Sequence, residues 1–170
     1  MNIKWLGAAL ILSGCGGVGF RMASDIRRQE KLLGQLIRVL HILESELQYR
    51  LSSLPELCGL ASQESSGILR ELFGKLSVRI SRQEQDDASA CMDIVLQDYP
   101  ALPRSVRKHL RYLGRSLGRF DLTGQLKGLQ TVRAACQTEL RNLRNNAEVR
   151  QKSYQTLAIC AGTSLVILFA

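Results

Sequence analysis

The last fifty residues, 121–170, constrain the fold of this chain most, because they contain no proline and keep a helical period throughout. Apolar side chains recur every three or four positions, which is the spacing of one helix face. Polar and basic residues occupy the other faces as far as Lys152, whereas residues 156–170 are apolar on every side. The pattern predicts one long helix that begins in water, packs on a partner and ends inside a bilayer.

Residues 5–20 form a second apolar segment, which carries no charge. As a helix they would span roughly 24 Å, and residues 1–4 bring this close to the roughly 30 Å of a hydrocarbon core. Three hypotheses apply: a permanent transmembrane helix, a secretory signal peptide, or a lipoprotein signal in which Leu12-Ser13-Gly14-Cys15 is the lipobox and Cys15 is lipidated. The basic cluster follows the apolar segment, which is the reverse of a signal peptide's charge order and favours the permanent helix.

The distribution of charge predicts a membrane hairpin. Of the 23 lysine and arginine residues, only Lys4 lies outside residues 21–152. Basic flanks stay on the cytoplasmic side of a membrane, so both apolar ends place the middle of the chain there. We therefore expect a transmembrane helix at 1–21, a cytoplasmic domain at 22–152 and a transmembrane helix at 153–170. Small residues at four-residue spacing in the first helix are candidates for packing against another membrane helix; they are Ala9, Ser13 and Gly17.

The middle domain is expected to be an all-α bundle of about six helices, flanked by the N- and C-terminal transmembrane helices. Leucines in residues 25–50 step by three and four positions, as in the inner stripe of a bundle; they are Leu33, Leu36, Leu40, Leu43 and Leu47. Ser53, Pro55 and Glu56 predict a capping box that starts a second helix. Further helices are expected at 68–83, from Asp86 or Asp87 to 99, and at 106–117, with Asp121 as the N-cap of the last helix. No stretch alternates with the period of a strand.

The sequence predicts no catalysis, no cofactor, no metal and no small-molecule substrate. The two histidines, His41 and His109, have no second histidine at metal-binding spacing on their own helices. No phosphate-binding loop or nucleophile motif is present. The five cysteines have no C-x-x-C pair, so buried free thiols are the simplest interpretation.

The net charge of +8 suits either a nucleic-acid binder or a membrane protein with a basic cytoplasmic side. Basic residues are concentrated in residues 104–117, where they are either a solvated face or a contact for anionic lipid or an acidic partner. They lack interleaved aromatic residues, which disfavours nucleic acid. The candidate partner-docking residues are Arg104, Arg107, Lys108 and Arg111.

Three motifs, in order along the chain, resemble the stage III sporulation protein AB family. The first is Leu40-x-x-Leu43-Glu44-x-Glu46-Leu47-x-Tyr49, followed by Leu54-Pro55-Glu56. The second is Leu113-Gly114-x-x-Leu117-Gly118-x-x-Asp121-x-x-x-Gln125, and the third is Lys152-x-Tyr154-x-x-Leu157 followed by Gly162. The lipobox-like segment that ends at Cys15 and the number of cysteines depart from the family pattern.

The resemblance implies a protein of the mother-cell membrane around the forespore, within the channel-like complex of the stage III proteins AA to AH. That family is similar to the cytoplasmic domain of the platform protein of type II secretion and type IV pilus machines, a small helical bundle without catalytic residues. It implies a scaffold whose partners are a secretion-type ATPase, small membrane proteins and the lipid membrane. The alternative function is a lipid-anchored or surface-exposed protein-binding module.

Overall fold

The computed structural model describes the backbone of residues 3–50, 52–85, 87–117 and 121–169, and the side chains of residues 24–146 within those ranges. There it contains six helices and no strand, which confirms the all-α class. The helices are α1 (Ile3–Tyr49), α2 (Leu54–Gln63), α3 (Ile68–Ser81), α4 (Ala88–Gln97), α5 (Arg104–Ser116) and α6 (Leu122–Phe169).

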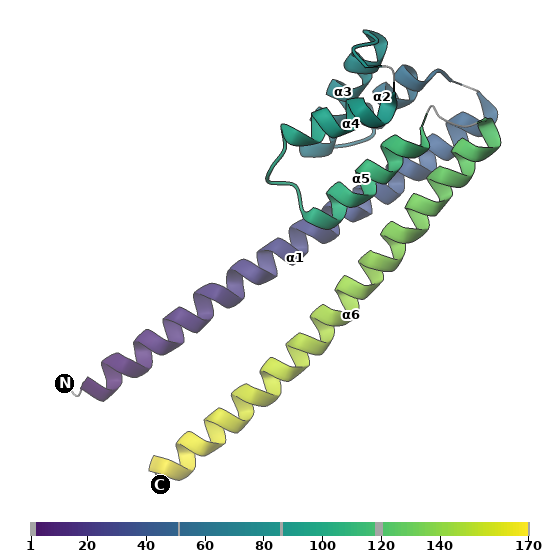
Figure 1. Ribbon diagram of the computed structural model, residues 1–170. Coiled ribbons are helices and arrows are strands. Elements are labelled where there is room, and N and C mark those ends of the chain that lie inside the picture. Colours follow the sequence, from purple (N-terminus) through teal and green to yellow (C-terminus); the bar gives the residue numbers. More distant parts are fainter. Residues whose placement is uncertain (1–2, 51, 86, 118–120, 170) are drawn as a thin grey trace.

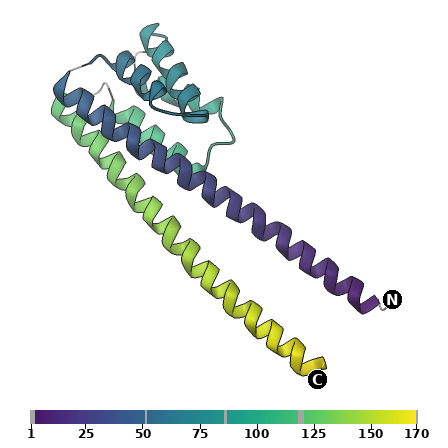
Figure 2. The same ribbon diagram turned by 180° about the vertical axis from the view of Figure 1, so that it is seen from behind.

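The described part of the chain consists of two long helices and four short ones, arranged as Figure 1 shows. Helices α1 and α6 run in opposite directions, so that their free ends lie at the same end of the molecule (Figures 1 and 2). The short helices α2 to α5 are gathered at the other end. There α1 packs on α6, α2 on α3, α4 on α5, and α5 on α6.

The core is built from the apolar stripes that the periodicity predicts. All five leucines of the α1 stripe are buried, and α5 contributes Val106, Leu110 and Leu113, followed by Leu117 at its C-cap. Helix α6 adds Leu129, Val132 and Cys136. Because fully burying one such side chain stabilises a fold by about 1.5–3 kcal/mol, these stripes are the main reason that the long helices associate.

Polar side chains start three of the helices. The Glu56 carboxylate accepts a hydrogen bond of 2.9 Å from the Ser53 backbone N–H, which completes the capping box of α2 and lowers the pKa of Glu56. The Asp87 carboxylate accepts from the Ser89 N–H at 3.2 Å and caps α4. The Asp121 carboxylate accepts from the Gly124 N–H at 3.1 Å in the first turn of α6. The predicted capping residues are therefore confirmed.

Two glycines allow α5 to lie close to its neighbours on both sides. A Cβ atom on Gly114 would lie 2.7 Å from the Met92 Cβ of α4. A Cβ atom on Gly128 of α6 would lie 2.6 Å from the Ser116 Cβ of α5. Helix α5 is therefore held between α4 and α6 at a distance that larger residues would not permit.

Ion pairs set the register between the first and last helices. Arg133 Nε donates to Glu44 Oε1 at 2.9 Å, and Arg144 Nε donates to Glu30 Oε1 at 3.3 Å. The first pair is largely buried, whereas Arg144 is exposed. We call the Glu30–Arg144 pair the lower rung, because it lies nearer the free ends of α1 and α6.

Within the part of the chain whose side chains are described, no helix has an apolar stretch long enough to cross a bilayer. The expected spans at 1–21 and 153–170 lie outside those side chains. The same is true of Cys15 and of the proposed packing residues Ala9, Ser13 and Gly17. The backbone of both segments is nevertheless helical, since α1 begins at Ile3 and α6 ends at Phe169.

Candidate functional site

The outer face of α5 carries a group of exposed cations. Positions three or four residues apart share a helix face, and this face lies opposite the buried stripe of α5. Tyr112 is 52% exposed at its edge. We call this surface the basic face of α5; its members are Arg104, Lys108, Arg111, Tyr112 and Arg115.

Two of the four predicted docking residues are bonded within the bundle. Arg107 is half-buried, and its Nη2 donates to the Tyr99 carbonyl oxygen at 2.7 Å, closing the loop between α4 and α5. Arg111 is exposed, and its Nε donates to Asp93 Oδ1 at 2.6 Å, tying α5 to α4.

The other two predicted residues, Arg104 and Lys108, are exposed and form no hydrogen bond or ion pair with any residue that the structure describes. Arg115, which is not among the predicted docking residues, is likewise exposed and has no described partner. These three cations are therefore available to a partner.

A polar cluster joins α1, α5 and α6 beside this face. Gln29 Nε2 donates to Ser105 Oγ at 2.6 Å and to Glu139 Oε1 at 3.2 Å. His109 Nε2 lies 2.6 Å from Glu139 Oε2, and both side chains are largely buried. The spacing along the sequence gives no sign of this cluster, because its members come from three helices. Its geometry fixes the position of α5 on the two long helices.

The described side chains include no group of three potential metal ligands. The described cysteines Cys58, Cys91 and Cys136 are free and buried. Burial raises the pKa of Cys58 and of Cys136 to about 12, and it raises the pKa of Cys91 too. A thiol with such a pKa is protonated at neutral pH and is a poor nucleophile, so these residues pack as small apolar side chains.

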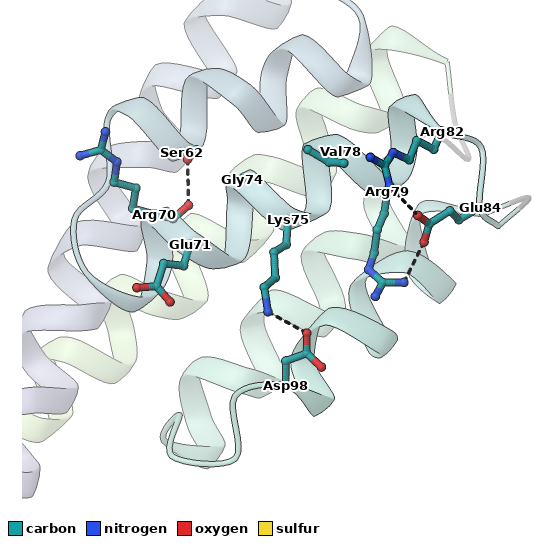
Figure 3. A pocket seen from close by; sticks show the side chains of 10 residues that line it. All are labelled: Ser62, Arg70, Glu71, Gly74, Lys75, Val78, Arg79, Arg82, Glu84 and Asp98. Carbon is teal, nitrogen blue, oxygen red and sulfur yellow. Dashed lines mark hydrogen bonds and ion pairs between the residues drawn. The ribbon is translucent and has the colours of Figure 1, made fainter.

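An open groove of about 660 Å³ follows the outer face of α3 (Figure 3). Lys75 Nζ donates to Asp98 Oδ2 at 2.9 Å, and this bond raises the pKa of Lys75. Arg79 Nη1 donates to Glu84 Oε2 at 2.8 Å. The principal charges of the groove thus neutralise one another, so the groove offers a partner less free charge than the basic face of α5.

The sequence profile of the family described as stage III sporulation protein AB matches residues 4–170. The chain belongs to this family. The stage III sporulation protein AB of Bacillus subtilis (strain 168) is 23% identical over 169 residues, which cover 98% of each chain. A solved structure of stage III sporulation protein AB superimposes with a TM-score of 0.61 at 19% identity, over 69% of this chain and 94% of that one. The family resemblance predicted from the motifs is confirmed, and the chain is a sporulation protein.

Several residues of the family motifs form helix contacts, helix caps or an ion pair within the bundle. Gly114 is the close contact between α5 and α4, and Asp121 caps α6. Glu44 bonds Arg133, and Glu56 completes the capping box of α2. These residues of the first two motifs therefore maintain the fold, whereas the third motif lies outside the described side chains. The basic face of α5 requires a separate argument.

Proposed function

We propose that the protein is a non-enzymatic platform of the stage III sporulation complex, anchored in the mother-cell membrane as a helical hairpin. In this proposal residues 1–21 and 153–170 cross the bilayer and the bundle at 22–152 lies in the cytoplasm. The bundle docks a secretion-type ATPase, and the spans hold the small membrane partners. Family membership supports the sporulation role, and the register of the two long helices supports the hairpin.

The lower rung, Glu30–Arg144, is the observation that carries the hairpin. Toward the N-terminus, α1 runs nine residues from Glu30 to Arg21, which is the charged residue next to the apolar segment at 5–20. From Arg144, α6 continues eight residues to Lys152, the last charge before the apolar C-terminus. At about 1.5 Å per residue, both apolar segments begin about 12–14 Å from the same rung. Two spans that enter one bilayer side by side must begin at the same level, and the equal distances of the two apolar segments from the rung support this proposal.

Protease protection tests the topology. In intact sporulating cells the domain at 22–152 should resist external protease, and in inverted membrane vesicles it should be cleaved. Carbonate extraction, which strips peripheral proteins, should leave the chain in the membrane. Cleavage of the middle domain from outside intact cells would contradict the hairpin and favour a surface-exposed binding module.

The lipid-anchored alternative has its own test. Lipidation and cleavage at Cys15 would remove residues 1–14 and add acyl chains, whereas a permanent helix keeps the full mass. Intact mass should therefore match the unprocessed chain, and Cys15→Ser should leave it unchanged apart from the substitution. An acylated, shortened product that disappears in the variant would establish the alternative.

A further inference from the structure

We infer that the basic face of α5 is the docking site for an acidic protein surface and stands too far from the bilayer to serve as a lipid contact. The inference rests on the proposed function, because it uses the hairpin to place the membrane. Arg104, Lys108 and Arg115 span eleven residues of one helix face, about 16 Å. They are exposed and unpaired within the described part of the chain, which makes them complementary to carboxylates presented on a protein.

The composition of the face distinguishes it from an ordinary solvated surface. Tyr112, 52% exposed, lies at the edge of the row of cations, and tyrosine and arginine are among the residue types that most often dominate binding energy at protein interfaces. The outer face of α1 provides a comparison, since Arg27, Lys31 and Arg38 are also exposed there without described partners. Between residues 27 and 38 that face has no exposed large apolar side chain among those described.

The height of the face above the membrane excludes lipid as its main partner. Arg104 precedes Ser105, whose hydroxyl bonds Gln29, so Arg104 lies close to the level of the lower rung. That level is about 12–14 Å from the last charges before the apolar segments.

Arg115 stands much farther away. It precedes Ser116, which contacts Gly128, and Gly128 is sixteen residues, about 24 Å, beyond Arg144 along α6. Since the Debye length at physiological salt is about 8 Å, headgroup charge acts on Arg104 at most. In Figure 1, α5 indeed lies along the half of the molecule opposite the two chain ends.

Crosslinking in sporulating cells tests the partner. A photoreactive residue replaces Tyr112 in the full chain, alone or together with either of two charge-reversal sets. One set is R104E/K108E/R115E on α5, and the other is R27E/K31E/R38E on α1, which changes the net charge equally. We expect an adduct that maps to an acidic segment of another protein. The α5 set should reduce its yield about tenfold or more, and the α1 set less than twofold.

Hydrogen exchange tests the membrane and nucleic-acid alternatives. The full chain is placed in nanodiscs of phosphatidylcholine with or without 30% phosphatidylglycerol, and in a third sample with a duplex oligonucleotide. Exchange of α5 should be the same in all three samples. Protection that appears only with the anionic lipid, or only with DNA, would overturn the inference, as would an adduct that both charge-reversal sets leave intact.

The two proposals fail separately. If protease protection and membrane retention persist while the α5 set has no effect on crosslinking, the hairpin stands and the docking inference is wrong. Thermal unfolding of both charge-reversal proteins should match the wild type, since all six side chains are exposed; this shows that any lost adduct reflects lost contact rather than lost folding.

Discussion

Gly114 and Gly34 both lie inside helices, but only Gly114 touches a neighbouring helix. A Cβ atom at Gly114 would meet Met92, whereas a Cβ atom at Gly34 would have nothing within 4 Å. We expect Gly114→Ala to destabilise the fold by about 1–3 kcal/mol through overpacking. Gly34→Ala should stabilise it by about 0.5–1 kcal/mol, because alanine loses less backbone freedom in a helix. Thermal unfolding of the full chain in detergent, followed by circular dichroism, measures both; shifts of the same sign would contradict the close contact.

For the arginines of α5, the sequence predicts which side chains face away from the core but not which of them have a partner. Helical spacing correctly indicates which positions of α5 face away from the core. It gives no information on what lies within reach of each side chain, because the Tyr99 carbonyl and Asp93 come from α4 and the loop after it. Arg107 and Arg111 are thus bonded within the bundle, while Arg115 is free of described partners.

At the scale of elements, the pairing of α1 with α6 contains two ion pairs of unequal weight. Glu44 and Arg133 are largely buried, so Glu44→Gln should cost about 1.5–3 kcal/mol, the worth of a hydrogen bond to a charged group. Glu30→Gln faces the exposed Arg144 and should cost less than about 1 kcal/mol. Thermal unfolding of these two variants, of the single variants Arg133→Gln and Arg144→Gln, and of the two double variants gives each coupling energy. Equal costs at the two sites would show that burial does not determine their strength.

The prediction of one long helix from Asp121 is confirmed by α6, because its signals are local: period, cap and absence of proline. The prediction of α3 extended to Gln83, whereas the helix ends at Ser81 and Gln83 has a φ of 51°. The polar cluster of Gln29, Ser105 and Glu139 could not be predicted, since it depends on how three separate helices pack.

At the scale of the whole molecule, continuous helices connect the bundle to the proposed spans. A movement of the bundle would therefore move the proposed spans against their membrane partners. Two glycines inserted after Lys152 should interrupt α6 and uncouple the two ends. We expect sporulation to fall while the bundle's melting temperature and the recovery of the protein in membranes stay unchanged. Two alanines at the same place add equal length but keep the helix, so they separate stiffness from spacing. Normal sporulation with the glycine pair would show that rigid coupling is unnecessary.

The pairing of the first helix with the last also determines when the protein becomes stable during its synthesis. Arg133 is 89 residues from its partner Glu44, and the α1 stripe is completed by α6. At about 5–20 residues per second, a ribosome needs roughly 4–18 s to cover that interval. For those seconds the leucines of α1 lack their final cover, so a nascent chain that stops before α6 presents an apolar surface to chaperones and proteases. Quality control therefore acts on incomplete chains, and the protein is protected from it once α6 has been made and packed.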